Sequence, residues 1–456
     1  MGARIRIGII GGGPAGYVAA IRGAQLGAEV TVFERERLGG VCTNHGCIPT
    51  KTLYALAAVK NEAKNLGNRG LWECTISHDW RRIIGYKDGV VSRLVKGIEF
   101  LLRKRAVKIV NSEAYLESPK VVKTVDGHSF QFDRILIATG SEAALPPING
   151  LSGIAPWDNR KALATERLPE SLVIVGGGVI GVEFAHIFAS FGVKVKIVEI
   201  MPRILPTIDD EISSLVHRAL VGEGVEIMTS AKAVSAERAV DRVRLKLESG
   251  EVVEGEEIIV ATGRKVTPPH GTQEVGINFE KNRISVNEYL MTNIDGIYAA
   301  GDIVGEPYLE HKATHQGITA VENMLGAKRR WDGSVMPTAI FSALEVGIVG
   351  LTPKEAEERF GNNIKVGKFP YVASGRAQTE GKANGFVRLV AAPDDKIVGF
   401  QAVGHHAAEL LGIGTTLVKL GAPLSKVAET IFAHPTLSEM ICEAALAGLR
   451  KPIHIV

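Results

Sequence analysis

The sequence is poor in cysteine, in net charge and in long apolar runs. Its 456 residues include only four cysteines, Cys42, Cys47, Cys74 and Cys442, which are too few for the disulfide framework of a secreted protein. They favour a reducing, cytoplasmic location in which any disulfide would be catalytic. The formal charge of +3, without a basic stripe, argues against a nucleic-acid partner. Because no stretch approaches the ~18 apolar residues of a membrane span, no membrane partner is expected either.

Two of the cysteines, Cys42 and Cys47, are five positions apart with Gly46 between them. The apolar stretch that begins at Pro49 predicts a helix. On a regular helix such positions differ by ~7.5 Å of rise, whereas a disulfide joins Cα atoms ~4.4 to 6.8 Å apart. Any bridge between them therefore needs an irregular loop. A ring this small would stabilise the fold by only ~2 kcal/mol, which favours a redox role for such a bridge over a structural one.

A thiolate near the start of this helix would be stabilised by the positive helix end and by the nearby cation of Lys51. Two buried thiols, or half of a metal site, are the other interpretations of the cysteine pair. Zinc would need a second cysteine pair, which the sequence lacks, so no metal site is expected.

An apolar stretch at 5–10 leads into a glycine-rich turn, an alanine-rich helical pattern and a second strand that ends at Glu34. In such a unit Gly11 allows the tight turn, Gly13 lets a pyrophosphate approach the helix N-terminus, and Gly16 lets helix and strand pack closely. Glu34 lies where a carboxylate accepts hydrogen bonds from a ribose. An ordinary strand-to-helix turn is the alternative. However, strand, helix and acid all fall in the places that a dinucleotide site requires.

The same unit recurs 165 residues later, and its register is kept from the first glycine to the acid. Internal repetition this regular predicts a second dinucleotide site. Each half also returns to an apolar strand that ends in Ala-Thr-Gly, at 138–140 and at 261–263. Two nucleotide sites and one cysteine pair indicate an electron relay. The repeated positions are Gly176, Gly178, Gly181 and Glu199, which correspond to Gly11, Gly13, Gly16 and Glu34.

Together these segments resemble the flavoprotein disulfide reductases, and the resemblance covers essentially the whole chain. It implies an α/β fold with two Rossmann-like domains, which bind FAD and NAD, and a C-terminal α+β dimerisation domain. The implied boundaries are 1–145 for the FAD-binding domain with the redox disulfide, 146–265 for the NAD-binding domain, 266–335 for a central domain that completes the FAD site, and 336–456 for the dimerisation domain.

The resemblance also implies roles for single residues. Cys42 and Cys47 would form the redox-active disulfide on the flavin, and Lys51, paired with Glu183, would lie by flavin N5. An exposed lysine and an ordinary helix glutamate are the alternative for that pair. Glu199 would accept hydrogen bonds from the NAD ribose and repel the extra phosphate of NADP, although Arg203 lies nearby. The implied FAD residues are Gly11, Gly13, Gly16, Glu34, Lys51, Ala114, Thr139, Gly140, Asp302 and Ala313, and the implied NAD residues are Gly176, Gly178, Gly181, Glu199 and Gly263.

The segment 431–439 resembles the active-site segment of the dihydrolipoamide dehydrogenases. There His434 would be the acid–base group, acting on the cysteines of the other subunit, and Glu439 would orient its imidazole. This arrangement implies a homodimer. The alternative is a capping box, in which Glu439 would reach back to the backbone of Thr436 and would not touch His434.

The implied reaction is the oxidation of dihydrolipoyl groups to lipoyl groups with NAD, through the disulfide and FAD. The dihydrolipoyl group could be carried on an acyltransferase or a carrier protein. Two alternatives are an NAD(P)H-dependent reductase of another disulfide or metal substrate, and a scaffold subunit of a 2-oxoacid dehydrogenase or glycine cleavage complex with secondary catalysis.

His45, between the two cysteines, departs from the family pattern. If its ring faces the disulfide, we expect it to make the thiolate state depend on pH near neutrality. A solvent-facing loop histidine is the alternative.

Overall fold

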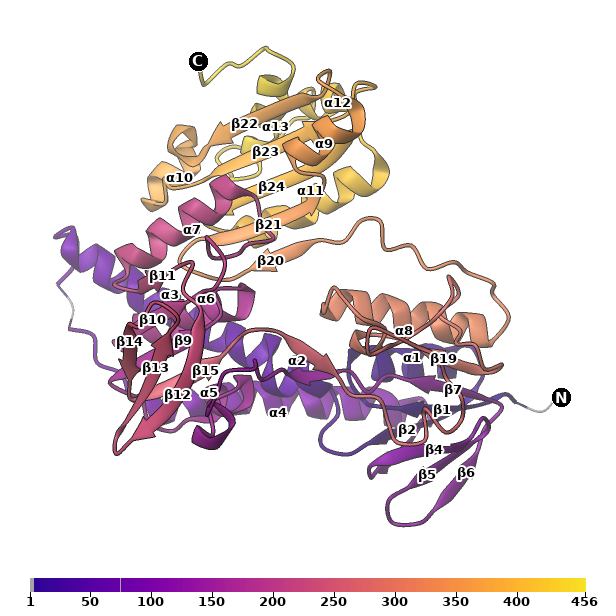
Figure 1. Ribbon diagram of the computed structural model, residues 1–456. Coiled ribbons are helices and arrows are strands. Elements are labelled where there is room, and N and C mark those ends of the chain that lie inside the picture. The colour runs from indigo at the N-terminus through magenta and orange to yellow at the C-terminus, as the bar shows by residue number, and fades with distance from the viewer. Residues whose placement is uncertain (1–3, 74) are drawn as a thin grey trace.

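The computed structural model describes residues 4–73 and 75–456, so Cys74 lies outside the described part of the chain. Three regions, each built around a sheet, are visible in Figure 1. Two of them contain the glycine-rich units, and the third is formed by the C-terminal part of the chain. The predicted α/β class with a C-terminal α+β region is confirmed.

The first region is a five-stranded sheet in the order β19-β7-β1-β2-β3, in which every neighbouring pair is parallel. Apart from the edge strand β3, which is partly exposed, its strands are largely buried and apolar, as expected of a parallel sheet covered on its faces. Helix α1 packs against α8, which comes from almost 300 residues later. The elements are β1 (Arg6–Ile10), α1 (Pro14–Gln25), β2 (Glu29–Glu34), β3 (Lys108–Asn111), β7 (Arg134–Ile137), β19 (Ile297–Ala299) and α8 (Glu310–Met324).

The second region repeats this plan with a four-stranded parallel sheet in the order β11-β10-β9-β15. The two glycine turns have the same backbone, because Gly11 and Gly176 both have a φ of +106°. The predicted repeat is therefore present in three dimensions. The elements are β9 (Ser171–Val175), α6 (Val179–Ser190), β10 (Lys194–Val198), α7 (Asp210–Gly222), β11 (Glu226–Met228) and β15 (Glu257–Val260).

Smaller elements surround these two sheets. The three-stranded antiparallel sheets are β4 (Ala114–Ser118), β5 (Val121–Thr124) and β6 (Ser129–Gln131), and β12 (Ala233–Ala239), β13 (Arg242–Leu247) and β14 (Val252–Gly255). The two-stranded ones are β8 (Ser141–Ala143) with β16 (Arg264–Val266), and β17 (Phe279–Glu280) with β18 (Arg283–Ile284). Helix α5 (Asn159–Ala164) and the short 3₁₀ helices η1 (Ser152–Ile154) and η2 (Asp302–Val304) lie in the connections.

The C-terminal region is an antiparallel sheet in the order β20-β21-β24-β23-β22, with helices packed on it. A long segment without regular structure leads to it from α8 (Figure 1). The elements are β20 (Thr338–Ile340), β21 (Glu345–Gly350), α9 (Pro353–Phe360), β22 (Lys365–Pro370), η3 (Tyr371–Ala373), α10 (Gly375–Glu380), β23 (Phe386–Ala391), β24 (Ile397–Gly404), α11 (Ala407–Leu420), α12 (Leu424–Ala428) and α13 (Glu439–Gly448).

The connection between β2 and β3 carries the cysteines and links the first two regions. It consists of α2 (Gly40–His45), α3 (Cys47–Asn68) and α4 (Trp80–Lys104). Helix α4 packs on α1, whereas α3 packs on α6 of the second region. The residues that follow Cys47 are therefore held between the two nucleotide-binding units.

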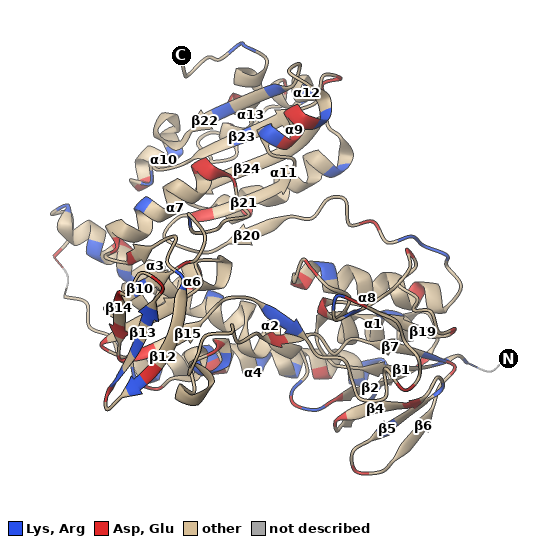
Figure 2. Cartoon of the chain, in the orientation of Figure 1, with Lys and Arg blue, Asp and Glu red and all other residues tan. Residues whose placement is uncertain are grey.

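Acidic and basic side chains are interspersed over all three regions (Figure 2). None of the helices in the described part of the chain combines the length and the apolar character needed to cross a membrane.

Candidate active site

The cysteine segment begins against the first glycine turn. Gly39 and Gly40 both have positive φ, +94° and +57°, which turns the chain sharply into α2. A Cβ on Gly40 would lie 2.7 Å from the Cα of Gly13, so a side chain there would push the two segments apart. The close approach places Cys42, on α2, next to the turn that is predicted to bind a pyrophosphate.

Gly46 separates the two cysteines. With φ −144° and ψ −110° it ends α2 and precedes α3, whose first residue is Cys47. The chain therefore does break between the cysteines, as a bridge would require, but only at Gly46, because Cys42 lies in a short helix. The helix predicted from Pro49 is present and begins two residues earlier, at Cys47. Both cysteines are free thiols in this structure.

A hydrogen bond between the two thiols distinguishes their chemistry. The thiol of Cys42 donates to Cys47, and this contact is the main cause that lowers the pKa of Cys47, against the opposing effect of burial. Lys51 lowers it further. The same hydrogen bond, together with burial, raises the pKa of Cys42. Of the two thiols, Cys47 therefore has the lowered pKa, next to the cation of Lys51.

Lys51 joins three parts of the chain. Its Nζ lies 2.9 and 2.8 Å from the two carboxylate oxygens of Glu183, a buried residue of α6. Glu183 also accepts a hydrogen bond of 3.1 Å from the backbone N–H of Phe341, just after β20. The Nζ is 4.8 Å from the centre of the Phe341 ring. Charge-assisted contacts of this kind fix the lysine beside the cysteines.

A cleft of about 450 Å³ opens beside the cysteines. Of the predicted FAD and redox residues it brings together Gly11, Gly13, Glu34, Cys42, Cys47, Lys51, Thr139, Gly140, Glu183, Asp302 and Ala313. Gly16 and Ala114 do not line it. A Cβ on Gly16 would be 1.8 Å from the Gly11 carbonyl oxygen, so this residue serves the packing of α1 on β1.

The cleft fits a dinucleotide. Two buried oxygens in its lining, Oγ1 of Thr139 and Oδ1 of Asn44, have no hydrogen-bond partner among the residues that the structure describes. A Cβ on Gly140 would meet no atom within 4 Å in the same part of the chain, so the backbone there is open to the cleft. Buried polar atoms without partners are rare in proteins, which indicates that a bound group is needed to satisfy them.

The wall of the cleft at Asp302 is built by Ser141 and Arg264, two residues that no motif in the sequence predicted. Ser141 donates a hydrogen bond of 2.5 Å to the Asp302 carboxylate, and Arg264 donates one of 2.7 Å to the Ser141 hydroxyl. Each directly follows one of the two Ala-Thr-Gly sequences. The shared position of Ser141 and Arg264, directly after the repeated Ala-Thr-Gly sequence, is the sequence feature that could have identified them as site residues.

The acids of the two glycine units are held in the same way. Glu34 accepts a hydrogen bond of 2.8 Å from the backbone N–H of Gly12, and Glu199 one of 2.5 Å from that of Gly177. A carboxylate oxygen has further lone pairs, so both acids can still accept from a ribose. The side chain of Arg203 is engaged elsewhere, 2.7 Å from Asp210.

In the part of the chain that is described, the second unit meets the cysteine cleft only through the first turns of α6, at Val179, Ile180, Glu183 and Phe184. Gly176, Gly178, Gly181, Glu199 and Gly263 do not line that cleft, whereas Glu183 from the same unit does. Within residues 4–73 and 75–456, a Cβ on Gly178 would meet no atom within 4 Å. This open backbone at the helix N-terminus suits the approach of a second pyrophosphate.

His434 and Glu439 are paired in the C-terminal region. Nδ1 of His434 is 2.9 Å from one Glu439 oxygen, and the other oxygen accepts a hydrogen bond of 2.8 Å from the Thr436 backbone N–H. The capping contact to the Thr436 backbone is therefore present, and only the part of that alternative in which Glu439 would not touch His434 is wrong. Although burial opposes it, the bonds from Thr436 and His434 lower the pKa of Glu439. The His434 side chain is 77% exposed and does not line the cysteine cleft of its own chain.

His45 faces a carboxylate rather than the sulfurs. Its Nε2 is 3.8 Å from Glu36, and burial is the main cause that lowers the pKa of its imidazole. The charged side chains that shift the thiol pKa values are Lys51, Glu183 and Glu310.

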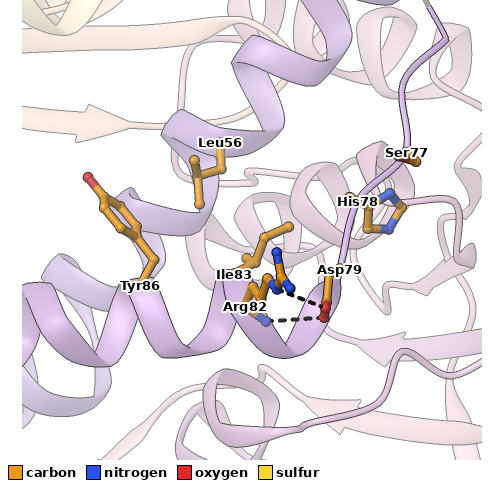
Figure 3. Close-up of a pocket in the computed structure, with 7 residues that line it drawn as sticks. All are labelled: Leu56, Ser77, His78, Asp79, Arg82, Ile83 and Tyr86. Atoms are coloured by element: carbon orange, nitrogen blue, oxygen red, sulfur yellow. Dashed lines mark hydrogen bonds and ion pairs between the residues drawn. The ribbon is translucent and has the colours of Figure 1, made fainter.

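A second cavity, of about 590 Å³, lies between α3 and the start of α4 (Figure 3). Its polar side chains include Asp79 and Arg82, whose carboxylate and Nε are 3.4 Å apart. The cavity contains none of the predicted site residues, so the redox chemistry is assigned to the cysteine cleft.

Two glycine units for dinucleotides, a close thiol pair between them and a separate C-terminal sheet region define a two-nucleotide disulfide oxidoreductase. The chain belongs to the pyridine nucleotide-disulphide oxidoreductase family, whose sequence profile matches residues 5–317. The profile of the family's dimerisation domain matches residues 336–445. This membership confirms the predicted enzyme class and the cofactors FAD and NAD, and it supports the predicted homodimer.

Curated and solved relatives agree with this assignment. The chain is 39% identical over 458 residues to the dihydrolipoyl dehydrogenase of Thermus scotoductus and 37% identical over 466 residues to that of Bacillus subtilis, each match covering 98% of both chains. Among solved structures, LpdA from Mycobacterium tuberculosis matches with a TM-score of 0.89 and 26% identity, over 97% of this chain and 99% of LpdA. The HOCl-induced flavoprotein disulfide reductase RclA from Escherichia coli matches with a TM-score of 0.87 and 26% identity, over 96% and 99%.

Proposed function

We propose that this chain oxidises dihydrolipoyl groups to lipoyl groups with NAD, as a dihydrolipoyl dehydrogenase. The observation that carries the proposal is the thiol pair Cys42 and Cys47 in a chain that dihydrolipoyl dehydrogenases match over nearly its full length. The comparisons give no support to a different disulfide or metal substrate, or to a scaffold role, over this reaction. The acyltransferase or carrier protein that would present the group, and the cytoplasmic location, stay predictions.

The reaction begins with a proton transfer to His434. Because Nδ1 of His434 is bound to Glu439, its Nε2 is left to accept the proton of a dihydrolipoyl thiol. The substrate thiolate attacks Sγ of Cys42 in the oxidised enzyme. The Cys42–Cys47 bond breaks, Cys47 leaves as a thiolate, and a mixed disulfide forms between substrate and Cys42.

The second substrate sulfur completes the oxidation. It attacks the first substrate sulfur, closes the lipoyl ring and releases the sulfur of Cys42, which takes up the proton that the second substrate thiol loses. Two electrons have then moved from substrate to the cysteine pair. The thiolate of Cys47 is stabilised by the hydrogen bond from Cys42 and by Lys51, which is the charge distribution that the lowered pKa of Cys47 describes.

When both cofactors are bound, the two electrons would pass through FAD to NAD, and the flavin and nicotinamide would supply this redox chemistry. In our proposal Gly11, Gly13, Thr139, Gly140 and Asp302 hold FAD by backbone approach and hydrogen bonding, with Gly16, Glu34, Lys51, Ala114 and Ala313 around it. Gly176, Gly178, Gly181, Glu199 and Gly263 hold NAD. We further propose the domain boundaries 1–145, 146–265, 266–335 and 336–456.

The first test is dihydrolipoamide oxidation by the purified protein with NAD and with NADP at equal concentration. We expect fast turnover with NAD, slow turnover with NADP, and loss of activity in Cys42→Ser with flavin retained. His434→Gln should lose ~10² to 10⁴-fold, the usual contribution of acid–base catalysis. A flavin-containing protein without dihydrolipoamide turnover would refute the proposal.

The shared active site has its own test. Dimers of Cys42→Ser or of His434→Gln alone should retain little activity, whereas a mixed dimer contains one site with an intact Cys42 and an intact His434 if the histidine comes from the other subunit. Co-expression with two affinity tags isolates that mixed dimer. We expect it to recover about half of the activity of the unmodified dimer, because one of its two sites is complete. No recovery would show that both residues act within one chain.

A further inference from the structure

Two consecutive residues of the second nucleotide-binding region reach across to the cysteine segment. The amide Nδ2 of Asn159 donates a hydrogen bond of 2.6 Å to the backbone carbonyl of His45. The guanidinium of Arg160 binds Glu36 with two contacts, of 2.7 and 3.3 Å. Both residues begin α5, and the preceding Trp157 pairs with Ile259 of β15, so α5 is anchored to the second sheet.

The two contacts fasten the segment that carries Cys42 at both of its ends. Glu36 lies six positions before Cys42, and His45 is the last residue of α2. The His45 carbonyl belongs to the peptide that joins α2 to Gly46, the irregular residue between the cysteines. Because glycine is the least restricted residue of the chain, a fixed carbonyl at this peptide limits how far Cys42 and Cys47 can move apart.

The charges around the fastening favour the ion pair. The hydrogen bond from Arg160 is the main cause that lowers the pKa of Glu36, against the effect of burial. Arg35 and His45 act on Glu36 in the same direction. The two charged side chains are 41% and 43% exposed, so the ion pair adds little to the stability of the fold. Its effect is expected on geometry rather than on folding.

We propose that Asn159 and Arg160 are positioning residues for the redox cysteines. They hold α2 so that Cys42 and Cys47 stay close enough to form a disulfide. In this way α5, which belongs to the second nucleotide-binding region, influences the equilibrium between the Cys42–Cys47 disulfide and the dithiol in the first region. A looser segment lowers the effective concentration of one sulfur near the other, which disfavours the disulfide relative to the dithiol. The inference rests on the proposed role of Cys42 and Cys47 as the redox pair.

The test measures the disulfide equilibrium directly. The flavin-loaded dimer is equilibrated with mixtures of reduced and oxidised dithiothreitol. In this exchange, reduced dithiothreitol converts the enzyme disulfide to the dithiol and becomes oxidised itself. Acid quenching, alkylation and peptide mass spectrometry then count the free thiols at Cys42 and Cys47. For Asn159→Ala and for Arg160→Gln we expect the equilibrium to shift about three- to tenfold toward the dithiol, which corresponds to about 14 to 30 mV.

Matched variants separate positioning from a general effect. Lys161→Gln removes a positive charge from the same helix, where the Lys161 Nζ lies over the Trp157 ring at 5.7 Å from its centre, and it should leave the equilibrium within twofold of the unmodified protein. Arg160→Lys keeps a cation for Glu36 and should restore most of the shift. If Arg160→Gln and Asn159→Ala behave like Lys161→Gln, the proposal is overturned.

Two outcomes keep the test decisive. If Arg160→Gln does not fold, Glu36→Gln removes the same ion pair from the other side and must shift the disulfide–dithiol equilibrium by the same amount. A Glu36→Gln variant with an unchanged equilibrium overturns the role of Arg160. If the unmodified protein forms no Cys42–Cys47 disulfide in oxidised dithiothreitol, the proposed function itself fails. An intact disulfide with unchanged variants refutes only the inference.

Discussion

The two glycine units have nearly the same backbone but very different surroundings. Gly11 and Gly176 share a φ of +106°, and the residues before the two helices, Gly13 and Gly178, have φ values of −71° and −73°. Helix α2 lies against the first turn, so close that a Cβ on Gly40 would stand 2.7 Å from Gly13. At the second turn no helix approaches Gly178 in this way, because a Cβ there would meet no atom within 4 Å among the described residues, although Ile204 covers the neighbouring Gly177. The local sequence therefore determines the turn, and the element packed on it determines whether the site is enclosed or open.

This difference has a functional meaning. An enclosed site suits a nucleotide that stays bound, whereas an open site suits one that enters and leaves in each reaction cycle. The proposed assignment of FAD to the first unit and NAD to the second follows that division. The same substitution made in each unit tests this difference. The effects on bound flavin and on NAD should differ because the two turns have different surroundings.

The largest difference is expected from the third glycine of each unit. A Cβ would lie 1.8 Å from the Gly11 carbonyl oxygen in Gly16→Ala and 2.0 Å from the Gly176 carbonyl oxygen in Gly181→Ala. Overpacking of this kind typically costs ~1 to 3 kcal/mol. We expect Gly16→Ala to lose bound flavin and nearly all activity. Gly181→Ala should keep the flavin and its reduction by dihydrolipoamide, and lose turnover with NAD.

The ratio of flavin to protein absorbance and anaerobic reduction by dihydrolipoamide measure the two outcomes. Gly97→Ala is the control, because a Cβ at this position in α4 meets no atom within 4 Å for the residues that are described. Loss of flavin from both glycine variants would contradict the assignment of separate nucleotides to the two units.

A smaller effect is expected from the two acids. A hydrogen bond to a charged group contributes ~1.5 to 3 kcal/mol, so losing the charge of Glu199 in Glu199→Gln should raise the KM for NAD ~10- to 100-fold. Bound flavin should not change. Glu34→Gln should have the reverse effect, with weaker retention of flavin in dialysis and an unchanged KM for NAD in the enzyme that is still loaded. Any variant that altered both cofactors together would argue for coupling between the units.

The parts of the site that the sequence predicts are those set by local spacing. The glycine turns, Glu34 and Glu199 belong to one repeated strand-turn-helix-strand unit, and His434 reaches Glu439 only five positions away. Their contacts follow from backbone geometry that a short segment determines.

The parts that the sequence did not predict depend on packing between distant segments. Asn159 meets His45 across 114 positions, and the pairing of Lys51 with Glu183 across 132 positions was accessible only through the family resemblance. The break at Gly46 was expected as a loop because helix propensity says little about a stretch as short as α2. No local pattern marked Asn159 or Arg160, whose role depends on where α5 docks.

A further effect should come from Glu310, the first residue of α8, which lines the cysteine cleft. Its carboxylate raises the pKa of both Cys42 and Cys47. Glu310→Gln should therefore lower both values, so the Cys47 thiolate forms at a lower pH. Lys51→Met should act in the opposite direction, because Lys51 lowers both values.

The pH dependence of Cys47 alkylation in the reduced enzyme measures these shifts. Glu409→Gln, which removes a carboxylate from the first turn of α11, serves as a control that should leave the profile unchanged. A Glu310→Gln profile that moved to higher pH would show that the carboxylate acts by something other than its charge. Because the second unit has no thiol to titrate, this property belongs to the enclosed site alone.

The smallest effect is expected for Arg203→Ala. Arg203 follows Glu199 closely, and a free arginine there could bind the phosphate of NADP. Its guanidinium is instead 2.7 Å from Asp210 and donates a hydrogen bond of 3.0 Å to the Pro206 carbonyl. Since an exposed ion pair contributes only ~0 to 1 kcal/mol, we expect little loss of stability and less than about a threefold change in the ratio of kcat/KM for NAD to that for NADP. A tenfold fall in NADP use would place Arg203 in the nucleotide site, and the openness of the second unit would then explain how the arginine reaches it.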